Sequence, residues 1–240
     1  MMVYEKEYLL RVSDFDKNDL LRPSAILDMF QSVAEEHARI LNIGYEELLA
    51  KNCVWVLLRS KYDVIKPVKF GTEKVIVKTW PLPQGKADYD RDYAIYSTSG
   101  ELLIMGSSKW CIINYQTRRL VFGANVAYPT GEEIYPMKNY EQGLKKIADF
   151  SIDGAQEFLG FAGDSSVDHN GHINNVKYCD FILDALSLEK GVNINSFEIN
   201  YINEIQIGNY SIYHIKDGEN RLIKGFSSQK ESFRAMIKTS

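Results

Sequence analysis

The chain repeats itself, and this duplication limits its fold more than any other feature of the sequence. The Asp-x-Asn motif at residues 16–18 recurs at residues 168–170, an offset of 152 (168 minus 16). Further on, residues 63–71 match residues 200–208 at an offset of 137 (208 minus 71). Internal similarity of this kind indicates a fold unit that occurs twice. The drop of 15 between the offsets (152 minus 137) predicts a shorter helix-to-strand connection in the second copy.

The first copy reads as a strand, a helix and then further strands. Residues 3–12 predict the strand, and apolar residues at helical spacing predict a helix from Pro23 to Leu41, with a short second helix at residues 44–49. From Trp55 to Asn114, β-branched and aromatic stretches between Gly and Pro turns predict antiparallel strands. The helix can bury its apolar face only against this sheet.

The second copy restarts the same pattern. Residues 149–159 predict a strand, residues 168–175 a polar turn, and a helix follows that Gly191 stops. Asn174 or Asn175 is the expected N-cap, and strands continue from Phe197 to the end. We therefore divide the chain into a first unit (1–123), a linker with several Pro and Gly residues (124–146) and a second unit (147–240).

Composition excludes several classes of protein. Apolar residues make up 45% and charged residues 25%, as in soluble globular proteins, and no apolar run is long enough for a membrane span. A net charge of −4 gives no case for nucleic-acid binding. The N-terminus does not resemble a signal peptide, so we expect a cytoplasmic protein. The three cysteines are too far apart for a disulfide framework or a structural zinc site: Cys53, Cys111 and Cys179.

The polar turn of the second copy is the candidate site. It places an acid, an amide and an imidazole just before a helix N-terminus, where backbone donors favour negative charge and could stabilise an oxyanion. Asp and Asn are also ordinary turn residues, so this stretch alone slightly favours a simple turn. However, the second copy has His172 and Glu204 where the first has Leu20 and Pro67. This asymmetry favours a single active site in the second half.

Other chemistries are less well supported. His169, His172 and Glu204 are poorly spaced for zinc, so we expect no metal. Cys179 could be a nucleophile beside His172, but it lies on the apolar helix face, where core packing is the better interpretation. The G-x-S-x-G elbow of serine hydrolases is absent.

With these residues in view, the chain resembles the acyl-ACP thioesterase family, which includes the plant FatA and FatB enzymes, and it looks like a bacterial member. The resemblance covers almost the whole length. It rests on Asp168-x-Asn170-x-His172-x-Asn174-Asn175-x-Lys177-Tyr178 and Glu204 in the second half, and in the first on Trp55, Thr79-Trp80, Arg91-Asp92-Tyr93, Gly100-Glu101, Ser108-x-Trp110 and Thr117-Arg118-Arg119-Leu120.

The resemblance implies an α+β tandem (double) hotdog fold, in which each copy wraps an antiparallel sheet around one long central helix. It implies hydrolysis of fatty acyl-[acyl carrier protein] thioesters without a cofactor, with Asp168, Asn170, His172 and Glu204 as the catalytic set. We expect Glu204, in a strand, to activate water, Asn170 and His172 to bind the carbonyl oxygen, and Asp168 to orient them. Asp168 as the nucleophile stays open. Many plant members have a Cys directly after the catalytic Glu, where this chain has Ile205.

The first copy would then supply the acyl pocket, and acyl carrier protein would be the partner. An acyl-CoA thioesterase, a non-catalytic acyl-binding hotdog protein and a hotdog dehydratase are alternatives, and a further homodimer stays open. The predicted pocket lining comes from the first helix and the strand after it: Met29, Phe30, Val33, His37 and Trp55.

Overall fold

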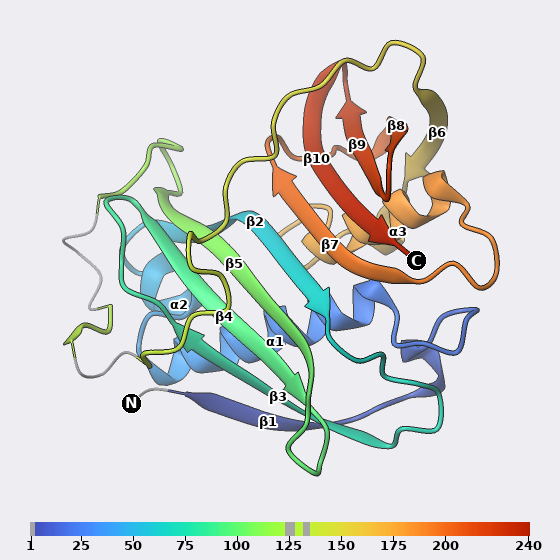
Figure 1. Cartoon of the computed structure of the whole chain (residues 1–240). Helices are drawn as coiled ribbons and strands as arrows, with labels where there is room; N and C mark the ends of the chain where they lie inside the picture. Colours follow the sequence, from blue (N-terminus) through green and yellow to red (C-terminus); the bar gives the residue numbers. More distant parts are fainter. Residues whose placement is uncertain (1–2, 123–127, 132–134) are drawn as a thin grey trace.

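The computed structural model describes residues 3–122, 128–131 and 135–240. These residues form one ten-stranded antiparallel sheet with helices on one face (Figure 1). The strand order is β1-β3-β4-β5-β2-β7-β10-β9-β8-β6, so five strands of the first half are followed by five of the second. Each half-sheet holds its own helix. This is the α+β double hotdog that the sequence predicted.

The first half contains five strands, two α-helices and one 3₁₀ turn. The strand expected over residues 3–12 is shorter, because the chain turns into the 3₁₀ segment after Leu9. The predicted long helix and the short helix after it are both confirmed. The elements are β1 (Tyr4–Leu9), η1 (Val12–Asp14), α1 (Pro23–Ile40), α2 (Tyr45–Leu49), β2 (Cys53–Val64), β3 (Lys74–Pro81), β4 (Asp88–Tyr96) and β5 (Leu102–Asn114).

The second half differs from expectation at several boundaries, and its strands after the helix begin at residue 194 rather than 197. Its first strand begins at residue 156 rather than 149, and its helix ends at Leu186, where Ser187 adopts a left-handed conformation, well before Gly191. Asn174 is the N-cap, since its side chain accepts from the backbone N–H of Val176. The elements are β6 (Gln156–Ala162), η3 (Asp164–Ser166), α3 (Asn175–Leu186), β7 (Ile194–Tyr201), β8 (Gly208–Asp217), β9 (Asn220–Ser227) and β10 (Lys230–Thr239).

The two halves meet at an approximate two-fold axis between β2 and β7. The strand order is symmetric about this pair, and residues 59–63 of β2 pair antiparallel with residues 196–200 of β7. Lys61 lies opposite Glu198, at the offset of 137 (198 minus 61) that the sequence repeat gave. The duplicated sequence is therefore a duplicated fold, joined edge to edge into one sheet.

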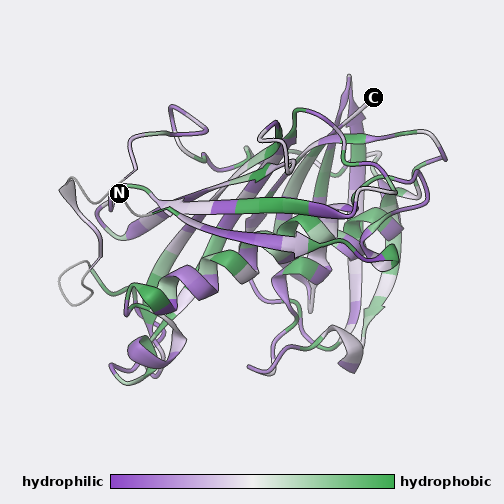
Figure 2. Ribbon diagram, turned by 90° about the horizontal axis from the view of Figure 1, so that it is seen from below, coloured by the Kyte–Doolittle hydropathy of each residue, from purple (hydrophilic) through white to green (hydrophobic). Residues whose placement is uncertain are grey.

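The helices cover one face of the sheet and enclose the main core. α1 and α3 begin at equivalent positions (175 minus 23 is 152), but α3 is six residues shorter and no helix like α2 follows it. Both the shorter helix and the missing α2 account for the lost length. Figure 2 shows apolar stretches (green) alternating with polar ones along the helices. No helix among the described residues is long and apolar enough to cross a membrane.

From residue 135 on, the described part of the segment between the halves runs along the sheet face opposite to the helices (Figure 1). The side chain of Asn139 donates to the carbonyls of Tyr93 and Gly106, at 2.7 Å each, and the backbone N–H of Ile147 donates to the side chain of Asn200 in β7. The expected linker, 124–146, falls partly outside the described residues, at 124–127 and 132–134. The unit boundaries stay predictions.

Asp92 makes the stability of this face depend on pH. The backbone N–H of Asn139 donates to its carboxylate at 2.7 Å, and burial raises the pKa of Asp92 to about 6. The folded protein therefore holds this proton more tightly than the unfolded chain does. The resulting stabilisation is complete below about pH 4 and is lost as the pH rises through 6, an effect of about 2–3 kcal/mol.

We expect the substitution Asp92→Asn to remove this dependence. The amide oxygen can still accept from Asn139, and no charge has to be buried at neutral pH. In urea denaturation, the free energy of unfolding of the variant, relative to wild type, should be about 2 kcal/mol higher at pH 7.5 than at pH 4.5. If the free energies of unfolding of variant and wild type differed by the same amount at both pH values, the carboxyl of Asp92 would not cause the pH dependence.

Candidate active site

The turn before α3 is a close copy of the turn before α1. In the second half, the N–H of Asp168 donates to the carbonyl of His172 at 2.8 Å; in the first, Asp16 donates to Leu20 at the same distance. Isolated β-bridges flank both turns at equivalent places, Val167 to Ile173 and Phe15 to Leu21. The backbone geometry is therefore shared, and only side chains can distinguish the two turns chemically.

The aspartate of each turn stabilises its own backbone. Oδ1 of Asp168 accepts from the N–H groups of Asn170 and His172, at 2.9 and 3.3 Å. Oδ1 of Asp16 accepts from residues 18 and 20 at 2.8 and 3.1 Å. Asp168 thus orients Asn170 and His172 through their main chain. The first half retains the acid and the amide, so the asymmetry between the halves reduces to positions 20 and 172 and positions 67 and 204.

We expected Glu204 to lie in a strand, but it lies in the loop between β7 and β8. The strand ends at Tyr201 because the chain turns away there, and Pro67, at the equivalent position, also follows the end of its strand. Oε2 of Glu204 is 3.8 Å from Nε2 of His172, and both side chains are about half exposed. The two groups that exist only in the second half are therefore neighbours.

The amide of Asn170 and the N-terminus of α3 flank His172 in the sequence. The side chain of Asn170 is exposed and makes no hydrogen bond with another described residue. Two residues after His172, Asn174 caps α3, so the first turn of that helix follows the imidazole closely in the sequence. The N–H groups of a first turn carry partial positive charge and are suited to an anion. The arrangement combines a carboxylate, an imidazole, a free amide and a helix N-terminus.

The first half contributes to this site as well, through two contacts that the sequence did not predict. Nη1 of Arg118, in the turn after β5, is 3.9 Å from Oε1 of Glu204. The ring of Tyr45, the first residue of α2, packs edge-on against His169 with centroids 5.7 Å apart. Arg118 belongs to the motif 117–120 that carried the resemblance, but nothing in its spacing indicated contact with a residue 86 positions later (204 minus 118).

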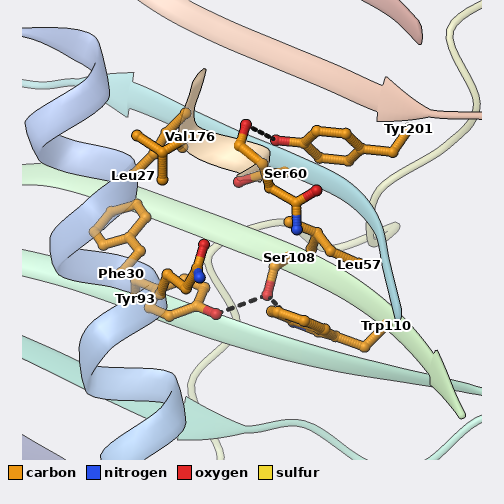
Figure 3. Close-up of a pocket in the computed structure, with 11 residues that line it drawn as sticks. Leu27, Phe30, Leu57, Ser60, Tyr93, Ser108, Trp110, Val176 and Tyr201 are labelled. Atoms are coloured by element: carbon orange, nitrogen blue, oxygen red, sulfur yellow. Dashed lines mark hydrogen bonds between the residues drawn. The ribbon is translucent and has the colours of Figure 1, made fainter. Parts of the chain in front are cut away.

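A narrow cavity of about 20 Å³ lies next to the start of α3, between the helices and the centre of the sheet (Figure 3). This volume holds about one water molecule. Residues of both halves line it, so it lies at their junction and not within the first half alone. Its lining is Leu27, Phe30, Gln31, Leu57, Ser60, Tyr93, Ser108, Trp110, Asn175, Val176 and Tyr201.

Of the predicted pocket residues, Phe30 lines this cavity, and its ring stacks on Tyr93 with centroids 4.5 Å apart. Met29 and Val33 are buried in the main core. Trp55 donates to the carbonyl of Ile43 at 2.8 Å. The role of the predicted lining stays a prediction.

His37 is buried and accepts a hydrogen bond from Nη1 of Arg91 to its Nδ1, at 3.0 Å. Burial, and then the charge of Arg91, lower the pKa of His37 to about 3. Its imidazole is therefore neutral near pH 7, and it acts as an acceptor in the interior of the first half.

Two other chemistries receive no support from the geometry. Cys179 is fully buried in the core, and burial raises the pKa of its thiol well above the usual value, so packing is its role. No group of three or more His, Cys, Asp or Glu side chains in the described part of the chain is arranged to hold a metal ion.

Family comparisons match both halves. The model described as acyl-ACP thioesterase N-terminal domain matches residues 1–123, and the model described as acyl-ACP thioesterase C-terminal domain matches residues 164–238. Among curated proteins, the palmitoyl-acyl carrier protein thioesterase of Gossypium hirsutum is 27% identical over 78% of this chain and 48% of its own length. An oleoyl-acyl carrier protein thioesterase of Arabidopsis thaliana is 24% identical over 78% and 55%. The chain spans about half the length of the curated relatives it matches.

Two solved structures share the whole fold. An acyl-ACP thioesterase from Bacteroides thetaiotaomicron superposes with a TM-score of 0.85 at 22% identity, covering 99% of this chain and 98% of that one. The 12:0-ACP thioesterase from Umbellularia californica gives a TM-score of 0.82 at 20% identity, covering 99% and 97%. At these identities the likeness establishes the double hotdog fold.

Proposed function

Because this chain belongs to the acyl-ACP thioesterase family, we propose that it hydrolyses the thioester of fatty acyl-[acyl carrier protein], releasing a free fatty acid and ending chain elongation. The observation that carries the proposal is the pair of His172, two residues before the N-cap of α3, and Glu204, with Nε2 and Oε2 3.8 Å apart. The equivalent turn of the first half has Leu20 and Pro67 instead. The pair is present at one of two otherwise matching sites.

The proposed reaction begins with water. Glu204 takes a proton from a water molecule, whose oxygen attacks the carbonyl carbon of the thioester. The carbonyl oxygen becomes an oxyanion, which His172, the side chain of Asn170 and the positive end of the α3 dipole stabilise. The C–S bond then breaks, and the leaving thiolate takes the proton back from Glu204. The products are a fatty acid and the free thiol of the carrier.

In this mechanism Asp168 is a positioning residue. Its Oδ1 accepts two backbone hydrogen bonds that shape the turn, and Asp16 does the same in the half without the chemistry. A carboxylate engaged in this way favours orienting Asn170 and His172 over attacking the substrate. Nucleophilic attack by Asp168 predicts a covalent acyl-enzyme, which a rapid quench with mass spectrometry would detect.

The acyl chain would enter between the helices and the sheet. The narrow cavity there begins at Asn175 and Val176, directly after the turn, and Phe30 of the predicted lining faces it. Because the cavity holds about one water, an alkyl chain requires side-chain movement along α1. Of the remaining predicted lining residues, Met29, Val33 and His37 lie on α1, and Trp55 lies in β2 and contacts the turn between α1 and α2. A homodimer, a cytoplasmic location and the division into units 1–123 and 147–240 stay proposals.

Comparison of two carriers tests the function. With the same acyl group, we expect kcat/KM for acyl-ACP to exceed that for acyl-CoA by about tenfold or more, since a protein carrier can contact surface outside the pocket. Equal or higher values for acyl-CoA would indicate an acyl-CoA thioesterase. Binding of both without turnover would indicate a non-catalytic acyl-binding protein.

A further inference from the structure

Glu204 lies between two nitrogen groups that come from different halves of the molecule. Oε2 is 3.8 Å from Nε2 of His172, and Oε1 is 3.9 Å from Nη1 of Arg118. Each carboxylate oxygen therefore faces its own partner. Neither distance is that of a direct hydrogen bond, which leaves room for solvent beside both oxygens.

The backbone around Glu204 is fixed, so its side chain is what needs orienting. On one side, the N–H groups of Ile202 and Asn203 donate to the carbonyl of Ser232, at 2.9 and 3.1 Å. On the other, the N–H of Ile205 donates to the hydroxyl of Tyr178 at 2.8 Å. The carboxylate itself projects, half exposed, from this anchored loop. Only neighbouring side chains can restrict its direction.

The turn that carries Arg118 is equally well built. The side-chain oxygen of Asn114 accepts from the backbone N–H groups of Gln116 and Thr117, at 3.1 and 2.8 Å, and from the hydroxyl of Thr117 at 3.0 Å. Arg118 itself has a φ of 56°, an unfavourable value for a side chain of its size, and its N–H donates to the carbonyl of Asn114. The turn thus holds the arginine in a strained conformation beside Glu204.

We propose that Arg118 is a positioning residue for Glu204, so that the water-activating carboxylate is completed across the two halves of the molecule. The guanidinium attracts one oxygen of the Glu204 carboxylate, so that the other oxygen points toward His172. In this orientation the carboxylate can take a proton from water at the thioester. The first half is then more than a pocket for the acyl chain. This inference rests on the proposed function.

The test is steady-state hydrolysis of acyl-ACP by Arg118→Gln, Arg118→Lys and a matched control, Arg119→Gln. Arg119 is the next residue in the same turn and its side chain makes no ion pair with a described residue, so its loss changes net charge equally. We expect Arg118→Gln to lower kcat about two- to fivefold with little change in KM, as the loss of an exposed ion pair allows. Arg118→Lys should recover part of the rate, because it keeps the charge. The deficit should shrink at high salt.

A double-mutant cycle separates positioning from other effects. In a Glu204→Gln background, Arg118→Gln should have no further effect on kcat, since the charge that it orients is gone. Three results would overturn the inference: an unchanged kcat in Arg118→Gln, an equal fall of kcat in Arg119→Gln, or a change confined to an increase in KM. The last result is expected if Arg118 binds the phosphate of the pantetheine arm. Turnover by the wild type would uphold the proposed function in all three cases. Absence of wild-type turnover would overturn both.

Discussion

Glu204→Gln lowers kcat for acyl-ACP hydrolysis by about 10²–10⁴-fold, the usual contribution of a general base. The amide has the size of the carboxylate but cannot accept the proton from water. Because the side chain is half exposed in an anchored loop, the substitution should leave the fold and KM nearly unchanged. The measurement is steady-state turnover with one acyl-ACP, together with thermal unfolding of the same preparations.

The first half offers a matched control for this prediction. Pro67 occupies the position equivalent to Glu204, and we expect Pro67→Ala to keep kcat within about twofold of wild type. If Glu204→Gln kept the wild-type rate with an intact fold, another group would have to activate the water. If Pro67→Ala lost as much activity as Glu204→Gln, both losses would come from changes in the structure of the two loops, and Glu204 would have no chemical role.

His172→Leu should cost about 10²–10³ in kcat, the loss typical when one oxyanion donor is removed. Leucine is the residue that the first half has at this position, Leu20, where it supports the same backbone hydrogen bonds. The turn before α3 should therefore keep its shape. The measurement is again kcat for acyl-ACP, with circular dichroism to verify the fold.

The reciprocal change in the first half is the control for His172. Leu20→His gives that turn an imidazole, but Pro67 still stands in the place of Glu204, so we expect no gain or loss in kcat beyond about twofold. If His172→Leu unfolded at a lower temperature and lost activity only in proportion to the fraction of unfolded protein, an oxyanion role would be contradicted. A wild-type rate in a folded variant would contradict it too.

Much of the fold could be predicted from the sequence because the chain describes it twice. The offset of 137 between residues 63–71 and 200–208 fixes which strands are equivalent, and the same offset relates Lys61 to Glu198, which face each other across the joined half-sheets. Helix starts were predicted well, since Pro23 and Asn174 are strong local signals. Strand ends were less certain, because they depend on where the partner strand stops.

The sequence indicates which residues to propose for the site but not how they lie relative to one another. The asymmetry between the halves indicated His172 and Glu204, yet the sequence suggested a strand for Glu204, which lies in a loop. It also could not show that Asp168 binds backbone amides as Asp16 does. The approach of Arg118 to Glu204 was not predicted, because it depends on the packing of two halves far apart in sequence.

The central claim is that the carboxylate and imidazole at one of two matching turns carry out the hydrolysis. The most direct test is turnover of an acyl-ACP by the double variant His172→Leu with Glu204→Gln, compared with wild type at equal folded concentration. We predict that the double variant stays folded, binds the carrier and releases fatty acid at least about 10³ times more slowly. A folded double variant that hydrolyses the thioester at the wild-type rate would contradict the claim.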